Sequence, residues 1–137
     1  MSFKSIFFYV LLGFVSLCSS ITPAEQAVIA HHLSTPPSSE LIEKNAANPE
    51  FEIIDVRTVE EFNSGHIAGA SYIDFYKKDF QQNLAKLDKD KTYLLYCRTG
   101  RRSGIALDMM KSLGFKHSYN MLGGITQWTA AKLPVEK

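Results

Sequence analysis

The sequence predicts an α/β fold with a mainly parallel central sheet and helices on both faces of that sheet. Segments with strand and helix character alternate along the chain, and the connections between strands are too long for hairpins. The clearest strand, residues 92–96, is apolar nearly throughout, as expected for a strand that is covered on both faces. The chain has 137 residues, with 45% hydrophobic and 21% charged residues, which indicates one globular domain.

Residues 1–20 have the layout of a secretory signal peptide. Lys4 supplies a positive charge, the run from Ser5 to Cys18 is uncharged, and small residues follow up to Ser20. The uncharged run is shorter than the about 20 residues that a membrane-spanning helix needs. We therefore expect cleavage after Ser20 and export, to a bacterial periplasm or as a secreted protein. Retention as an anchor and lipidation at Cys18 are the alternatives.

Removal of this segment would change the charge and the cysteine content. The whole chain has 15 basic and 14 acidic residues, and Lys4 is the only charge in the segment, so the two signs would become equal. That balance gives no indication of nucleic acid or an anionic membrane as a partner. Of the 2 cysteines, only Cys97 would remain. A single thiol in an oxidising compartment is a liability unless it is buried or used, which makes Cys97 a candidate functional residue.

Capping and breaking residues predict where the elements begin and end. Residues 22–25 resemble a capping box with an early proline, which predicts a short helix through His32, and the proline-rich residues 34–39 predict a linker. We therefore divide the chain into a signal peptide (1–20), a short helix and linker (21–36) and one domain (37–137). Strands are expected at 51–56, 70–73, 92–96 and 117–120. Helices are expected at 40–48, 58–63, 79–87, 103–113 and 125–132.

The loop of residues 97–103 joins the clearest strand to a helix that is expected to begin near Ser103. Backbone amides in such a loop can form a nest for an anion, and the helix adds the positive end of its dipole. Fixed positive charge comes from Arg98, Arg101 and Arg102. In comparable settings the pKa of a cysteine falls from about 8.5 to roughly 3.5–7.5. The sequence therefore predicts that Cys97 is a nucleophilic thiolate at neutral pH.

The arginines of this loop indicate a small anionic substrate, because the guanidinium fork suits oxyanions. Both sulfur transfer and cysteine-dependent phosphate-ester hydrolysis use such a layout. Those phosphatases need their phosphate-binding arginine at the position that Ser103 occupies, and Arg102 comes one residue too early. They also usually have histidine where this chain has Tyr96. The shorter loop favours sulfur over a tetrahedral phosphate.

Three stretches together resemble single-domain rhodaneses, from about Thr35 to Pro134. The first, residues 55–70, has Asp-x-Arg, an acidic residue and an aromatic, and then Gly-His-Ile-x-Gly-Ala. The second is the loop of residues 97–103. The third comprises Gly114-Phe115, Asn120-Met121-Leu122-Gly123-Gly124 and Trp128.

The resemblance implies a rhodanese-like fold and a thiosulfate sulfurtransferase activity in which Cys97 becomes a persulfide. The residues that correspond to the anion-holding loop are Arg98, Thr99, Gly100, Arg101, Arg102 and Ser103. Asp55 and Arg57 match positions that help to shape the site, although a buried pair of this kind can be purely structural. The expected partners are a small anionic sulfur donor and a thiol or cyanide acceptor. No metal or organic cofactor is expected, and we expect a monomer that binds neither nucleic acid nor, after cleavage, a membrane.

Three other functions remain open from the sequence. One is a phosphatase or arsenate reductase, which the loop length disfavours. The second is a non-catalytic rhodanese-like module that binds or senses sulfur species. The third is a persulfide carrier that delivers sulfur to a partner protein.

Overall fold

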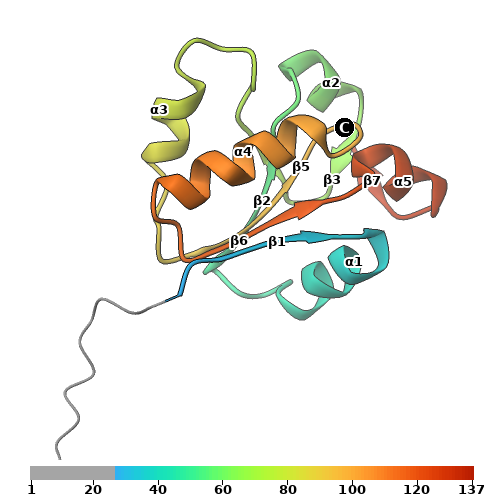
Figure 1. Cartoon of the computed structure of the whole chain (residues 1–137). Helices are drawn as coiled ribbons and strands as arrows, with labels where there is room; N and C mark the ends of the chain where they lie inside the picture. Colours follow the sequence, from blue (N-terminus) through green and yellow to red (C-terminus); the bar gives the residue numbers. More distant parts are fainter. Residues whose placement is uncertain (1–26) are drawn as a thin grey trace, which may run out of the picture.

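The computed structural model describes residues 27–137, in which a five-stranded parallel sheet has the order β1-β6-β5-β2-β4 (Figure 1). Its strands are β1 (Ile29–Leu33), β2 (Phe51–Asp55), β4 (Ser71–Tyr72), β5 (Thr92–Tyr96) and β6 (His117–Met121). A second, antiparallel pair consists of β3 (His66–Ile67) and β7 (Val135–Glu136). The helices are α1 (Thr35–Lys44), α2 (Val59–Ser64), α3 (Phe80–Ala85), α4 (Arg101–Ser112) and α5 (Gly124–Ala130). The predicted signal peptide lies outside the described residues.

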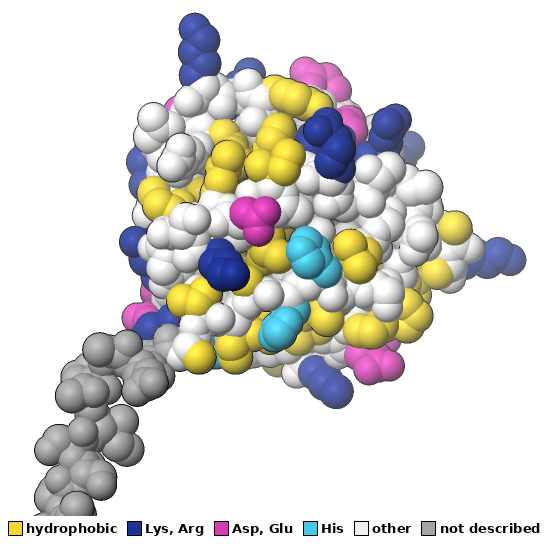
Figure 2. Space-filling model, viewed as in Figure 1, with side chains coloured by type: hydrophobic (Ala, Val, Ile, Leu, Met, Phe, Trp, Pro, Cys, Tyr) yellow, Lys and Arg dark blue, Asp and Glu magenta, His cyan; other side chains and the backbone are white. Residues whose placement is uncertain are grey.

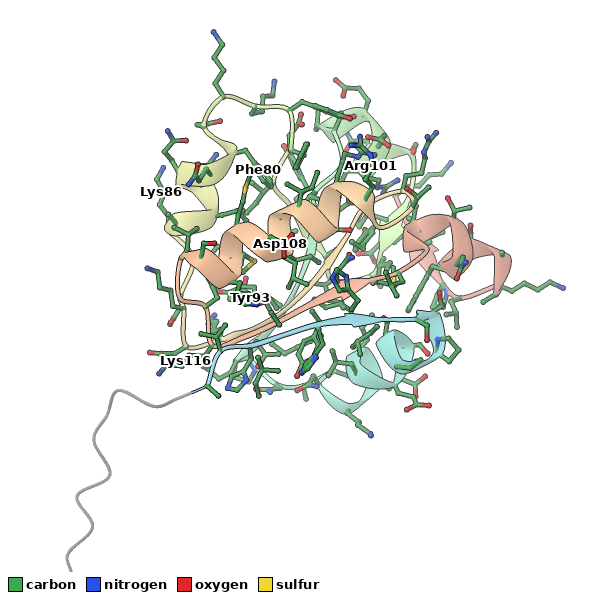
Figure 3. All side chains as sticks on the ribbon, in the orientation of Figure 1. Phe80, Lys86, Tyr93, Arg101, Asp108 and Lys116 are labelled. Carbon is green, nitrogen blue, oxygen red and sulfur yellow. The ribbon has the colours of Figure 1, made fainter. Side chains whose placement is uncertain are left out.

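Helices cover both faces of the sheet, as the sequence predicts. On one face α3 and α4 pack over a core that includes Phe80 and Tyr93, and on the other α1 and α5 pack over a core that includes Trp128 (Figures 1 and 3). The central strand β5 contributes to both cores, because its side chains alternate between the two faces. The apolar run that predicted this strand therefore reflects burial on both sides.

The structure contradicts the expected helix through His32 and the expected linker of residues 34–39. Residues 29–33 form the edge strand β1, which pairs in parallel with β6. The next helix, α1, begins at Thr35, with proline in its first turn. Proline is tolerated there because the first amides of a helix have no intrahelical acceptor. The folded unit thus includes β1 and the start of α1, both of which precede the expected boundary at residue 37.

The short strands β3 and β7 were not predicted, and the remaining elements agree with their predictions to within a few residues. Helix α2 begins with a complete capping box, in which Thr58 and Glu61 each bond the backbone amide of the other, and Gly65 ends it. Helix α4 begins two residues before the expected start at Ser103, because Gly100 adopts a left-handed conformation (φ 100°) and turns the chain directly into the helix. None of the helices between residues 27 and 137 has the length and apolar character that a bilayer crossing requires.

Candidate active site

The carboxyl ends of β5, β2 and β6 lie at one edge of the sheet, because the three strands run in parallel. Cys97 follows β5 directly, and only 1% of its surface is exposed. Figure 3 shows Arg101 at the end of α4 next to this loop, with Lys116 beyond the opposite end of the helix. The site therefore forms where open α/β sheets usually bind their ligands, outside the carboxyl ends of the strands.

The loop after Cys97 is held from behind by the start of α5. The Ile125 amide donates to the Cys97 carbonyl at 2.9 Å, and the Thr126 amide donates to the Arg98 carbonyl at 3.1 Å. A Cβ atom on Gly124 would lie 2.4 Å from the Cys97 carbonyl oxygen, so the close approach requires glycine. Because these carbonyls point toward α5, the amides that follow are free to point toward the sulfur.

Cys97 Sγ accepts hydrogen bonds from the Gly100 amide at 3.0 Å and from the Ser103 hydroxyl at 3.4 Å. Burial raises the pKa of the Cys97 thiol, but hydrogen bonds from the Ser103 hydroxyl and the loop amides outweigh burial and lower the pKa below its ordinary value. The direction matches the sequence prediction, and the loop amides that the prediction named are among the groups that lower the pKa of Cys97.

The three arginines occupy different positions. Arg98 and Arg101 are exposed at the rim of the pocket, and Figure 2 shows Lys and Arg side chains gathered around the start of α4. Arg102 is buried and donates two hydrogen bonds of 2.8 Å to the carboxylate of Glu61. These hydrogen bonds raise the pKa of Arg102 and lower that of Glu61 to about 2. The ring of Tyr76 lies over the guanidinium of Arg102, with its centroid 5.5 Å away.

A cavity of about 280 Å³ opens at Cys97, and most of the predicted loop residues line it. It is lined by Glu61, Tyr76, Cys97, Arg98, Thr99, Arg101 and Arg102. Three guanidiniums lie in this lining against one carboxylate, that of Glu61, which is paired with Arg102, so the cavity suits a small anion that reacts with sulfur. Gly100 and Ser103 contribute behind this lining, through their hydrogen bonds to the sulfur.

The sequence reasoning did not assign Glu61 and Tyr76 to the site. Glu61 was singled out only within the stretch of residues 55–70 that resembles the rhodaneses, and that stretch says nothing of Arg102, which lies 41 positions later. Tyr76 comes from the segment between β4 and α3, for which no motif was identified.

Asp55 and Arg57 are not among the residues that line the cavity, and they pair with each other next to it. Asp55 is fully buried, and Arg57 is bound to its carboxylate, with 2.6 Å between Nη2 and Oδ2. The same guanidinium donates to the Gly65 carbonyl at 2.7 Å. The pair thereby ties the end of β2 to the end of α2, which carries Glu61. Within residues 27–137, no group of three or more His, Cys, Asp or Glu side chains is arranged to hold a metal ion.

A family model for the rhodanese-like domain matches residues 38–131. The chain belongs to the rhodanese-like family. Solved structures agree: a rhodanese-like domain from Anabaena has a TM-score of 0.63 and 25% identity, covering 77% of each chain. A rhodanese-like domain protein from Staphylococcus aureus has a TM-score of 0.59 and 28% identity, covering 72% of this chain and 90% of that one.

Several relatives are named as sulfurtransferases. The probable adenylyltransferase/sulfurtransferase MoeZ of Mycobacterium tuberculosis is 34% identical over 90% of this chain, but the match spans only 31% of that protein. The putative sulfurtransferase YtwF of Bacillus subtilis is 37% identical, covering 69% of this chain and 88% of the relative. The thiosulfate sulfurtransferase GlpE of Coxiella burnetii is 33% identical, covering 66% of this chain and 79% of the relative. The names support sulfur transfer in general.

Proposed function

We propose that this protein is a sulfurtransferase that moves sulfane sulfur from a small anionic donor such as thiosulfate to a thiophilic acceptor through a persulfide on Cys97. One observation carries the proposal. Cys97 Sγ lies at the base of a cationic cavity and accepts hydrogen bonds from the Gly100 amide and the Ser103 hydroxyl. These donors stabilise a thiolate, and the cavity suits a small anion.

The proposed first step is attack of the Cys97 thiolate on the outer sulfur of thiosulfate. A new sulfur–sulfur bond forms at Cys97, the sulfur–sulfur bond of thiosulfate breaks, and its electron pair leaves with sulfite. In the second step, cyanide or a thiolate attacks the outer sulfur of the persulfide, and the electron pair of that bond returns to Cys97. Thiocyanate or a new persulfide leaves, and no external oxidant or reductant is needed.

The loop supplies the stabilisation that each step needs. The Gly100 amide and the Ser103 hydroxyl hold the negative charge on Cys97 before the attack and when it returns. The exposed guanidiniums of Arg98 and Arg101 face the incoming donor and the departing sulfite. Arg102 is already paired with Glu61, so it shapes the wall of the cavity rather than offering a free charge.

Intact mass of the full chain before and after thiosulfate tests this proposal. We expect the gain of one sulfur atom, its loss on addition of cyanide, and ping-pong kinetics. Cys97→Ser should abolish the mass gain and the turnover, whereas Cys18→Ser should retain both. Sequential kinetics without a persulfide on Cys97 would contradict the mechanism. A stable persulfide that only a dedicated partner protein discharges would instead identify a carrier.

We also propose that the protein is exported, because Lys4 and the uncharged run from Ser5 to Cys18 have the layout of a cleavable signal. The same intact mass reports this, since cleavage after Ser20 removes residues 1–20. Recovery of the uncleaved chain from the membrane fraction would contradict the cleavage.

A further inference from the structure

Asn120, on β6, lies directly beneath the Cys97 loop, and its side chain is fully buried. Its Nδ2 donates to the Gly100 carbonyl at 3.1 Å. The amide of the same Gly100 donates to Cys97 Sγ at 3.0 Å. One residue of the loop is therefore held at its carbonyl by Asn120 while its amide holds the reactive sulfur.

A second group fixes the orientation of the Asn120 amide. Nδ2 lies 3.0 Å from Nδ1 of His32, and Nδ2 is a donor only, so Nδ1 of His32 is the acceptor in this contact. His32 and Asn120 are direct neighbours in the parallel pairing of β1 with β6. The reversed amide orientation would place Oδ1 against the Gly100 carbonyl, two acceptors facing each other.

Helix α4 approaches this pair closely. Its Gly104 lies over both side chains, and a Cβ atom there would be 3.4 Å from Nδ2 of Asn120 and 3.7 Å from Cε1 of His32. The Gly104 amide also donates to the Gly100 carbonyl, at 3.0 Å. His32 is exposed at its outer side, and Figure 2 shows histidine side chains at the surface over β1.

We propose that Asn120, oriented by His32, is a positioning residue for the Cys97 loop. It touches no substrate and acts through Gly100, by fixing the residue whose amide meets the sulfur. Without His32, one N–H of the buried amide loses its acceptor and the amide is free to rotate away from Gly100. Without Asn120, the Gly100 carbonyl retains only its bond to the Gly104 amide. The proposal rests on Cys97 being the reacting group of the proposed function.

The pH dependence of alkylation by iodoacetamide tests the proposal without any sulfur donor. Trypsin cleaves after Lys91 and Arg98, so the peptide between them reports Cys97 by mass spectrometry, separately from Cys18. We expect Asn120→Leu to raise the apparent pKa of Cys97 and to slow alkylation about tenfold below that pKa, as loss of one buried hydrogen bond implies. We expect His32→Leu to slow it about threefold and His32→Asn, whose Oδ1 can replace Nδ1 as acceptor, to restore the rate.

Two matched controls separate positioning from general damage. Ser118 lies two residues before Asn120 on the same face of β6, and its buried hydroxyl has no hydrogen-bond partner among residues 27–137. Cys97 should therefore be alkylated at the wild-type rate in Ser118→Ala. The same rate is expected in His31→Leu, which changes the histidine on the opposite face of β1. If Ser118→Ala is as slow as Asn120→Leu, or if His32→Leu has the wild-type rate, the proposal is wrong.

The proposal can still be tested if Asn120→Leu does not fold or if no persulfide forms. If Asn120→Leu does not fold, the comparison of His32→Leu with His32→Asn still tests the arrangement, because His32 is exposed and its variants should fold. Equal rates in these two variants would overturn it. Absence of a persulfide after thiosulfate would refute the proposed function and leave the order of the alkylation rates unchanged, so the two failures are distinguishable.

Discussion

Replacement of Glu61 by glutamine separates two roles that this side chain has in the structure. Glutamine can still accept from the Thr58 amide and complete the capping box. It cannot form the ion pair with Arg102, in which two oxygen atoms each accept a hydrogen bond at 2.8 Å. Glu61→Gln therefore removes the ion pair and keeps the cap.

The magnitude follows from the pKa of Glu61. Hydrogen bonds from Arg102 lower that pKa from 4.5 to about 2. Taken at face value the difference corresponds to about 3 kcal/mol of stability at neutral pH. Because 31% of the Glu61 side chain is exposed, solvent screening reduces this, and we expect Glu61→Gln to lower the free energy of unfolding by about 2 kcal/mol.

The pH dependence provides the sharper measurement. A carboxyl whose pKa is lower in the folded state stabilises the fold fully above its unfolded pKa, and this contribution is lost as pH falls through the folded pKa. In urea denaturation, the difference between wild type and Glu61→Gln should be constant above pH 4.5 and should disappear as pH approaches about 2. Glu60→Gln, on the same helical turn, controls for the helix dipole. A difference that does not change with pH would refute the ion-pair explanation.

Three further predictions concern the donor to the sulfur, the close approach of α5 and the exposed arginines. Ser103→Ala removes a hydrogen-bond donor to Cys97 Sγ and should raise the pKa of Cys97. Alkylation of Cys97 should therefore be slower than in the wild type at acidic pH, and the two rates should become equal at high pH, where Cys97 is ionised in both proteins. Gly124→Ala should lower the free energy of unfolding, measured in urea, by about 2–4 kcal/mol, because the new Cβ would collide with the Cys97 carbonyl and the backbone has φ +54°. Gly69→Ala is the control: its Cβ would meet no described atom within 4 Å, so only the backbone strain at φ +78° should reduce its stability. Arg98→Ala and Arg101→Ala should each raise the KM for thiosulfate about three- to tenfold, and this increase should be smaller at high salt. Neither change should alter the free energy of unfolding. Lys111→Ala, in the last turn of α4, is the control and should leave the KM unchanged.

The reactive loop was predictable from sequence because its signals are local. An apolar strand, a short loop with three arginines and the start of a helix are contiguous, and the structure joins them in that order from Thr92 to Ser112. The lowered pKa of Cys97 was likewise expected from a loop of amides before a helix. The pairing of Arg102 with Glu61 was not expected, because Glu61 lies on another helix, 41 positions earlier in the chain.

The edge strand β1 shows why the rest was not predictable. The capping box at residues 22–25 and the prolines at 36 and 37 are local signals for a helix and a break. The strand instead obtains its hydrogen bonds from β6, and its His32 meets Asn120, which lies 88 positions along the chain. Pairing over that separation leaves no periodic trace in a strand of five residues.

In the cavity, hydrogen-bond donors surround the sulfur of Cys97 and exposed arginines lie at the entrance. This arrangement fits the charges that the reactants and products of the proposed reaction carry. A thiolate and a thiosulfate dianion become a persulfide anion and a sulfite dianion, so the total charge is the same before and after the transfer. The repulsion between the two anions is therefore present from their first encounter and is not created by the bond exchange. Exposed guanidiniums such as Arg98 and Arg101 reduce it where the donor enters. The Gly100 amide and the Ser103 hydroxyl act instead on the sulfur atom, where negative charge is present before the attack and after the sulfur has been released.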